Sequence, residues 1–472
     1  MLLNELPNLQ HEEINMKSMN KIAQTNSDVS RGISCDMQGD VVSPADDNYA
    51  QCRAVWNGAV SHHPLAIAQC QTTQDVQAVV RLARSRDLRV SVRGGGHDWA
   101  GRSMCDGGVV IDLSAMRGVE VDATDRVATV QGGARATDLA AAAAPHGLAA
   151  VTGNAGSVGL AGLTLGGGYG PLTPRYGLAL DNLLGADVVL ADGRCVTADA
   201  RENRELFWAL RGGGGNFGVV TAMRLRLHPV RELQAGIIVY PWWQAELVLR
   251  RYAEWVTRAP DAMSVTAAVL ASPDGEPALV LAPTWCGAPQ VGEPLLQGLQ
   301  CLGTPLLVQM GAATCPELLG MYEAHAPAGR HYALQTRWLP ALTADVIAAI
   351  IAAGGARTSP FSSIVLHHFH GAPTRVAANA TAFGLRQEHF LLEVIAAWEP
   401  DARADGGTHR EWARRLSQAI APASLPGGYP NLLAAGDHDQ IAAAYGGNVE
   451  RLRATKRRYD PDGVFTATPL PL

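Results

Sequence analysis

The sequence predicts a protein of the α+β class with more than one domain. A chain of 472 residues is long for a single compact core, and a hydrophobic fraction of 47% supports a buried core in each part. Helical and strand-like spacings alternate between residues 75 and 190, which is typical of a mixed α/β domain. After His228-Pro229 most of the tryptophans appear, and longer helical stretches alternate with β-rich runs. This change predicts a second domain of different architecture.

The elements of the first region follow from their spacing and their turns. Asp75–Arg86 carries apolar residues at helical spacing, and the alanine-rich segment Ala136–Ala144 predicts a second helix. Strands are expected at Arg89–Val92, Val109–Leu113, Ala128–Val130 and Ala186–Leu190. Asp192-Gly193 is typical of a turn after the last strand. In the second region, Ser362–Phe369 and Phe390–Ala397 have the composition of strands.

Composition narrows the class of protein and its partners. Residues 1–35 are rich in Asn, Gln, Glu and Lys and lack the hydrophobic core of a secretory signal, so we expect a loosely ordered extension over residues 1–38. The eight cysteines have no metal-binding spacing, which predicts reduced thiols in a cytoplasmic protein. No apolar run reaches the ~18–20 residues of a membrane span. The net charge of −6 argues against a nucleic-acid or membrane partner.

Three glycine-rich segments carry the strongest functional signal. In the first, Val90–Gly101, an apolar run leads into three glycines and ends on His97. Without side chains, backbone N–H groups can approach and surround an anionic group. Gly153–Gly170 and Arg211–Val220 repeat the pattern further along the chain. Ordinary turns explain one glycine cluster but explain three poorly, so we expect a large phosphate-bearing cofactor.

A Rossmann-type dinucleotide site is the first alternative. Gly166–Gly170 resembles the glycine-rich turn of that motif. The motif requires a helix to begin directly after the glycines. Here Pro171–Pro174 follows, with a proline at each end, and this is a poor helix start. The Rossmann interpretation is therefore not favoured.

Six segments together resemble a known family. They are Arg93–His97, Gly108–Leu113, Gly159–Gly168, Tyr176–Asn182, Leu206–Gly218 and Lys456–Asp462. In this order they resemble the berberine-bridge-enzyme-like branch of the FAD-linked oxidases, which share the fold of vanillyl-alcohol oxidase. The resemblance implies a two-part FAD-binding domain, residues 39–228 and 425–472. It also implies a substrate domain, residues 229–424, with an antiparallel sheet backed by helices.

The resemblance implies a covalent bond between His97 and the 8α-methyl of FAD. Most members add a second bond from a cysteine in the loop that begins at Gly153. That position is Ala155 here, and no cysteine occurs between Cys105 and Cys195. We therefore expect a single linkage, as in some bacterial members of the family.

The remaining cofactor contacts are expected from the glycine segments and from the C-terminal return. Backbone donors are favoured over the Arg93 side chain, because a strand-end arginine is as often a structural ion-pair partner. The residues expected at FAD are His97, Arg93, Gly94, Gly95, Gly96, Asp98, Gly153, Asn154, Ser157, Val158, Gly159, Gly162, Asn216, Gly218, Val220, Tyr429, Asn431 and Asn448.

Flavin oxidation calls for a base beside the substrate. Glu393 is the one charge in an apolar strand-like run, where burial would raise its pKa toward neutrality. The matching position in the family holds a glutamate or glutamine near the substrate, and the alternative is a solvated face of an edge strand. His367 and Tyr445 are further catalytic candidates. On a strand, His368 and His370 share the face opposite His367, so these three are not expected to bind one metal ion.

Together these features predict an FAD-dependent oxidase of a small aromatic or heterocyclic metabolite, with O2 as acceptor, acting as a monomer or homodimer. Two alternatives stay open, namely a sugar or alcohol oxidase or dehydrogenase of the same family and a flavin-binding protein without turnover. Trp99 and Ala444 replace tyrosines of plant members, which makes a tyrosinate-dependent mechanism doubtful. The resemblance implies that the position of Leu163 affects oxygen access, and its bulky side chain leaves dehydrogenase behaviour open.

Overall fold

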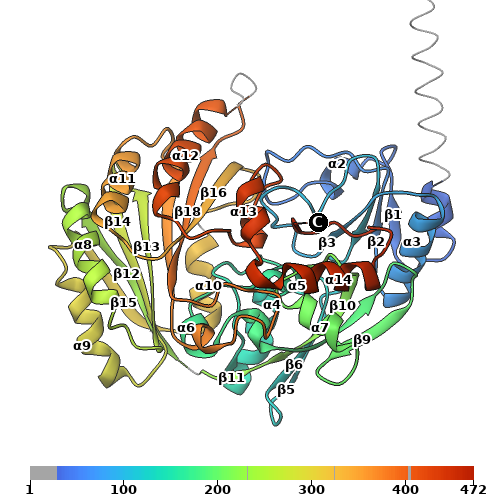
Figure 1. The fold of residues 1–472 in the computed structure, drawn as a ribbon, viewed down its shortest axis with the longest axis horizontal. Helices are drawn as coiled ribbons and strands as arrows, with labels where there is room; N and C mark the ends of the chain where they lie inside the picture. The colour runs from blue at the N-terminus through green and yellow to red at the C-terminus, as the bar shows by residue number, and fades with distance from the viewer. Residues whose placement is uncertain (1–28, 231, 324, 402–405, 472) are drawn as a thin grey trace, which may run out of the picture.

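The computed structural model describes residues 29–230, 232–323, 325–401 and 406–471. The chain builds one part, crosses into a second part, and returns to the first with its C-terminal helices, as Figure 1 shows. Residues 1–28 of the predicted extension lie outside the described residues. Residues 29–34 are helical, and Val29 and Ile33 are buried in the core. The loosely ordered extension was thus predicted too long, because two apolar residues anchor its last turns.

The first part begins with a four-stranded sheet in the order β1-β2-β4-β3, in which β2, β4 and β3 are parallel. Its elements are β1 (Asp40–Val42), α2 (Tyr49–Cys52), β2 (Ala66–Gln69), α3 (Thr73–Ser85), β3 (Val90–Arg93) and β4 (Val109–Asp112). Helix α3 starts two residues before the predicted boundary, because Thr72 and Asp75 form a capping box. The first glycine segment follows the carboxyl end of β3, where parallel sheets commonly bind ligands.

A five-stranded antiparallel sheet, β5-β6-β10-β8-β9, completes the first part. Its strands are β5 (Val119–Asp122), β6 (Val127–Gln131), β8 (Leu183–Val189), β9 (Cys195–Asp199) and β10 (Val219–Arg226). The short strands β7 (Leu148–Ala149) and β11 (His228–Pro229) pair with each other. Its helices are α4 (Ala136–Ala143), α5 (Leu160–Gly166), α6 (Thr173–Tyr176), α7 (Arg204–Leu210), α13 (His438–Ala443) and α14 (Val449–Tyr459).

The second part is a seven-stranded antiparallel sheet, β15-β12-β14-β13-β17-β18-β16. Its strands are β12 (Leu233–Pro241), β13 (Met263–Ala271), β14 (Pro277–Trp285), β15 (Leu307–Ala313), β16 (His331–Leu339), β17 (Ser363–Phe369) and β18 (His389–Trp398). Its helices are α8 (Ala245–Val256), α9 (Pro289–Gln300), α10 (Cys315–Glu323), α11 (Ala344–Gly355) and α12 (Gly407–Ile420). Helices α8, α9, α11 and α12 cover the face turned away from the first part, as Figure 1 shows.

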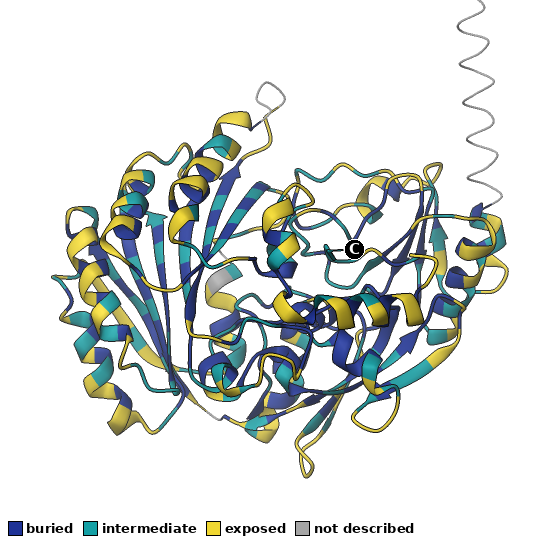
Figure 2. Ribbon diagram, in the orientation of Figure 1, coloured by how far each residue is buried: buried dark blue, intermediate teal, exposed yellow. Residues whose placement is uncertain are grey.

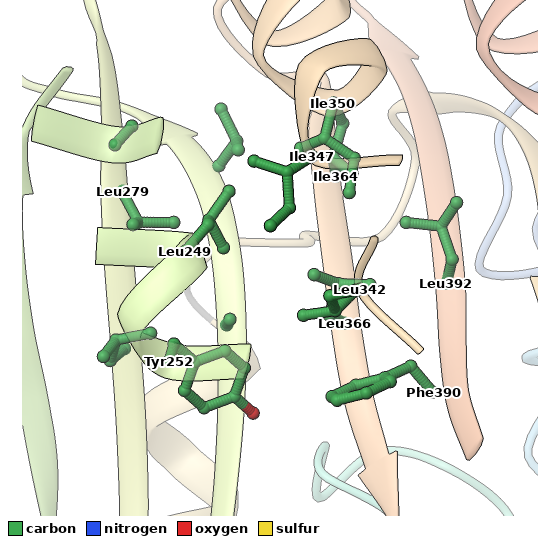
Figure 3. Close-up of a cluster of buried hydrophobic side chains, with 14 of the residues drawn as sticks. Leu249, Tyr252, Leu279, Leu342, Ile347, Ile350, Ile364, Leu366, Phe390 and Leu392 are labelled. Atoms are coloured by element: carbon green, nitrogen blue, oxygen red, sulfur yellow. The ribbon is translucent and has the colours of Figure 1, made fainter. Parts of the chain in front are cut away.

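Alternate residues of the central strands face opposite ways. Ile364 and Leu366 of β17 and Leu392 of β18 belong to the apolar core beneath the helices, which Figure 3 shows in close-up. Figure 2 shows the strands mostly buried between the outer helices and the first part. Residues of the other parity, including His367 and Glu393, therefore face the first part.

The predicted strands and helices are confirmed with small shifts of boundary, but the second glycine segment holds an unpredicted helix. Helix α5 carries glycine at two of its seven positions, and glycine is a poor helix former. Leu160 and Leu165 are buried in the core, and the carbonyl of Leu165 accepts the N–H groups of Gly212 and Gly214. Tertiary packing thus overrides the local preference.

Candidate active site

A cavity of about 370 Å³ lies between the two parts of the molecule. Its walls come from segments far apart in the sequence: the turn after β3, the glycine loop before α5, the start of β10 and the C-terminal residues 465–468. The seven-stranded sheet of the second part contributes His367, Leu391 and Glu393. Glu323 and Ala326 come from the end of α10 and the residues after it. The α+β arrangement thus brings all three glycine segments to one site.

Glycine is required where the first two segments meet. A Cβ atom added to Gly95 would lie 2.3 Å from the backbone nitrogen of Gly159, and one added to Gly159 would lie 2.3 Å from that of Gly95. Gly96 has a φ of +68°, which favours glycine. Within the described residues, the N–H groups of Gly94, Gly95 and Gly96 donate to no protein acceptor. They are therefore available to an anionic group in the cavity.

Arg93 turns away from this cavity. Its Nε donates to Oδ1 of Asp112 at 3.0 Å, and a second guanidinium nitrogen pairs with Oδ2. Asp112 is fully buried and also accepts from the backbone N–H and hydroxyl of Ser114. Arg93, which the sequence analysis placed among the residues at FAD, is absent from the described lining of the cavity and is a structural ion-pair partner of β4 instead.

His97 is held against an aromatic stack. Its ring lies 5.2 Å from that of Trp56 at an interplanar angle of 22°, and Trp56 stacks in turn on Tyr332 at 4.2 Å and 10°. Burial lowers the pKa of His97 to about 4, with a smaller effect in the same direction from Arg135. The imidazole is consequently neutral at pH 7 and keeps a nitrogen lone pair.

Glu393 and His367 form the polar pair on the sheet side of the cavity. Oε1 of Glu393 lies 3.5 Å from Nε2 of His367, and each side chain is about one-sixth exposed, at 16% and 15%. Burial raises the pKa of Glu393 to about 7 and lowers the pKa of His367 to about 4. His367 is therefore neutral at pH 7, and Glu393 is close to half ionised there and becomes mostly carboxylate as the pH rises further.

The other two histidines of this strand lie on its opposite face. His368 and His370 are buried and stack on each other at 4.2 Å, and Nε2 of His368 lies 2.8 Å from Oε1 of Glu388. Only His367 of this group lines the cavity among the described residues. The strand phase that the sequence left open is settled by the packing of β17 against the helices.

Tyr429 and Asn431 return to the cavity from the C-terminal region. The hydroxyl of Tyr429 accepts the backbone N–H of Gly168 at 2.8 Å, and Nδ2 of Asn431 donates to the carbonyl of Gly162 at 3.1 Å. A Cβ on Gly166 would lie 2.0 Å from Oδ1 of Asn431. These contacts fasten the returning segment to helix α5.

Most of the predicted cofactor residues line this cavity. Together with His367 and Glu393, the lining includes His97, Gly94, Gly95, Gly96, Asp98, Gly153, Asn154, Ser157, Val158, Gly159, Gly162, Gly218, Val220, Tyr429 and Asn431.

Three predicted site residues hold the fold behind the cavity wall instead. The described lining includes none of Tyr445, Asn448 and Asn216. The fully buried Tyr445 hydroxyl donates to the carbonyl of Pro469 at 3.2 Å. Asn448 donates to backbone carbonyls near residue 381, and the amide nitrogen of Asn216 donates to the carbonyl of Gly213. Their side chains satisfy backbone groups of the chain itself.

Sequence reasoning missed several residues of the cavity wall. Trp56, Tyr169 and Glu323 line it, and Glu323 accepts the N–H of Ser157 at 2.6 Å from across the two parts. The hydroxyl of Tyr169 lies 3.0 Å from Nε2 of the buried His389, whose Nδ1 lies 2.8 Å from a backbone carbonyl. Only Tyr169 had a local signal, because it directly follows three glycines.

Comparison with known proteins decides the family. The family model described as FAD binding domain matches residues 64–199, and the one described as berberine and berberine like matches residues 430–469. The (R)-6-hydroxynicotine oxidase of Paenarthrobacter nicotinovorans is 31% identical over 443 residues, which cover 91% of this chain and 95% of that protein. The chain belongs to the berberine-bridge-enzyme-like family of FAD-linked oxidases.

Two further matches agree with this family. The FAD-linked oxidoreductase aurO of Gibberella zeae is 32% identical over 436 residues, covering 90% of this chain and 84% of that protein. The solved structure of 6-hydroxy-D-nicotine oxidase from Arthrobacter nicotinovorans matches with a TM-score of 0.83 at 30% identity. It covers 92% of this chain and 97% of the other. The predicted vanillyl-alcohol-oxidase-type fold and the FAD-linked oxidoreductase class are confirmed.

The cavity of this FAD-linked oxidase fits the cofactor of its family. The backbone N–H groups of Gly94, Gly95 and Gly96 suit a diphosphate. Gly95 and Gly159 pack closely and have no side chains that would keep a ligand away from these donors. In the part of the chain that the structure describes, no helix is long and apolar enough to cross a membrane.

Proposed function

We propose that this FAD-linked oxidase carries its flavin on a single bond to His97 and oxidises a small aromatic or heterocyclic metabolite, with O2 as the acceptor and hydrogen peroxide as a product. Glu393 is the proton acceptor and His367 its partner. The single observation that carries the proposal is the buried Glu393–His367 pair on the wall of the cavity that also holds His97.

When bound, FAD supplies the acceptor for a hydride that leaves a substrate carbon. The chain's own task is to take the proton from the attached O–H or N–H group. Because the pKa of Glu393 is raised to about 7, its carboxylate is present near neutral pH and is a stronger base than an exposed glutamate. Burial lowers the pKa of His367 to about 4, so its imidazole is neutral near pH 7. A neutral imidazole can lie beside the carboxylate of Glu393 without forming a salt bridge that would weaken it as a base.

The attachment site supports a single covalent bond. His97 is neutral, is fixed by its stack on Trp56, and lines the cavity. Ala155 lies on the same wall and has no nucleophile. Cys105 follows the first glycine turn by a few residues, but its thiol is buried. Its Sγ lies 3.9 Å from the carbonyl oxygen of Arg89.

The lining of the cavity supports an aromatic or heterocyclic substrate. Tyr169, Tyr429, Trp99, Leu391 and Leu163 contribute aromatic and aliphatic surface to the wall of the cavity. Such a wall offers stacking and apolar contact to a flat molecule but few hydrogen bonds to a sugar. The likeness to (R)-6-hydroxynicotine oxidase over almost the whole chain supports the same class of substrate.

The test begins with acid precipitation of the purified protein and of His97→Ala. Flavin should stay in the pellet of the wild type only, and the flavin-bearing peptide should contain His97. Flavin that is released from the wild type would contradict the covalent bond. Two flavin-bearing peptides would contradict the single linkage.

Substrate class is tested by peroxide release from a panel of aromatic amines, phenolic heterocycles, sugars and alcohols. Glu393→Gln should lower turnover of any active compound by about 10²–10⁴-fold, which is the range of general-base catalysis. Glu254→Gln, on the exposed side of α8, is the matched control. Turnover of sugars alone, or equal turnover by Glu393→Gln, would contradict the proposal.

A further inference from the structure

A second hollow of about 910 Å³ lies on the outer side of α7 and α14, which lie side by side in the FAD-binding part (Figure 1). It shares no described lining residue with the cavity of about 370 Å³ that holds His97 and Glu393, which we call the flavin cavity. Five arginines line it, namely Arg201, Arg204, Arg211, Arg451 and Arg458, and we call it the arginine pocket. The only described carboxylate of its lining is Glu205.

The spacing of the arginines concentrates positive charge on facing sides of two helices. Arg204 and Arg211 are seven residues apart at the two ends of α7, and Arg451 and Arg458 are seven residues apart on α14. Seven residues are almost two helical turns, so each pair projects from one side of its helix. The whole chain carries a net charge of −6, so this local excess of cations runs against the overall charge.

Two of the arginines are held in place by aromatic rings. Arg451 lies 4.1 Å above the ring of Trp208 and donates to both carboxylate oxygens of Glu205, at 2.8 and 2.9 Å. Arg211 lies 4.1 Å above Phe207, and its Nε donates to the carbonyl of the same residue at 3.3 Å. The single carboxylate is thus occupied, and two guanidinium groups are oriented before any ligand binds.

The pocket lining holds five arginines and one described carboxylate, Glu205, whose pKa is lowered mainly by Arg451 and further by the charges of Arg458 and Arg204. Among the described residues, Arg201, Arg204 and Arg458 form no ion pair with a carboxylate, and all three are exposed. Burial lowers the pKa of Arg211, the carboxylate of Asp181 opposes that effect, and the charges of Arg386 and Arg451 lower the pKa further. An anion bound among several like charges reduces their mutual repulsion.

We propose that the arginine pocket binds a small molecule through a diphosphate or similarly close-spaced phosphate groups, as a site separate from the flavin cavity and beyond the oxidase function. Planar guanidinium groups match phosphate oxygens in pairs. Arg451 already donates to Glu205, so the groups offered to a phosphate are chiefly those of Arg201, Arg204 and Arg458, which have no ion-pair partner among the described residues. The hollow is of metabolite size, and the arginines surround it from two helices. A nucleic-acid strand would instead need a long basic stripe on this acidic chain.

Isothermal titration calorimetry of the FAD-loaded protein with inorganic diphosphate tests the site. FAD occupies its own diphosphate site during this experiment. The wild type should bind diphosphate saturably, and the affinity should fall as salt rises, because the contacts are ionic. The double variant Arg204→Gln/Arg458→Gln should lose at least about tenfold in affinity, since charge-assisted hydrogen bonds are the strong ones.

A matched control removes the same charge elsewhere. Arg414→Gln/Arg415→Gln changes two exposed arginines of α12 in the other part of the molecule and should leave diphosphate binding unchanged. Near-ultraviolet circular dichroism and flavin absorbance verify that both double variants fold and keep FAD.

Three outcomes would overturn the inference. The first is that the wild type binds no diphosphate, and the second is that the pocket variant binds it as well as the wild type. The third is that the protein binds a short single-stranded DNA but not diphosphate. None of these outcomes depends on the oxidase substrate, so failure here is distinct from failure of the proposed function.

Discussion

Replacing Glu393 with glutamine should make the stability of the protein depend less on pH. The folded protein raises the pKa of this carboxyl from 4.5 to about 7 by burying it. Ionising it therefore costs more in the folded state than in the unfolded state. The contribution of this group to stability is fully present below pH 4.5 and is lost as pH rises from 4.5 to about 7. Above that pH the loss is constant.

The size of the effect follows from the shift of the pKa. A difference of about 2.5 units corresponds to about 3 kcal/mol at full ionisation, at 1.36 kcal/mol per unit. Between pH 5 and pH 8 most of this difference develops, about 2–3 kcal/mol. Glutamine has no charge at any of these pH values. The stability of Glu393→Gln relative to the wild type should therefore improve by that amount as pH rises.

Urea unfolding followed by circular dichroism at pH 5, 6, 7 and 8 measures the difference between the two proteins. Glu254→Gln, whose carboxyl is exposed on α8, controls for the loss of one negative charge. Infrared difference spectra of the wild type and Glu393→Gln titrate the Glu393 carboxyl independently of unfolding. The protonated carboxyl has a C=O stretching band that disappears when the group ionises. A relative stability that stays constant from pH 5 to pH 8 would refute the reasoning.

Two further predictions concern the supports of the cavity. Asp112→Asn leaves the guanidinium of Arg93 without its buried anionic partner, and should lower the free energy of unfolding by about 3–5 kcal/mol; an unchanged urea midpoint would show that the pair is dispensable. Trp56→Leu removes the ring that stacks on His97 and on Tyr332, where each aromatic pair contributes about 0.5–1.5 kcal/mol. It should lower the melting temperature and the fraction of flavin retained after acid precipitation, whereas full retention would mean that the stack does not position His97.

Local patterns in the sequence were enough for much of the FAD-binding part. The Gly94–Gly96 turn, the strand before it and His97 after it are neighbours in the chain, so their place on one wall of the cavity could be expected from adjacency alone. Helical spacing of apolar residues and turn chemistry also placed α3 and the turn at Gly193 to within a few residues. These features depend on contacts between residues that lie close in sequence.

The substrate side could not be predicted to the same depth. Strands β17 and β18 are buried on both faces, so hydrophobic alternation does not distinguish the helix side from the cavity side. That His367 and His368 lie on opposite faces could be predicted, but which face is turned to the cavity depends on the packing of Ile364 and Leu366 under the helices. Glu393 and the rise of its pKa on burial were predicted from the apolar run around it, but its partner His367 comes from a neighbouring strand.

The sequence by itself determined the family motifs, the glycine cradle and the absence of a cysteine at Ala155, because each is written in contiguous residues. Only the tertiary structure decided which side chains share a cavity. It assigned Arg93 to Asp112 and Tyr445 to the core, and it joined arginines of α7 and α14 in one pocket. The physical reason is that burial, ion pairing and stacking depend on distances between segments that are separated in the sequence, by 19 residues for Arg93 and Asp112 and by 246 for Glu205 and Arg451, and no local pattern records those distances.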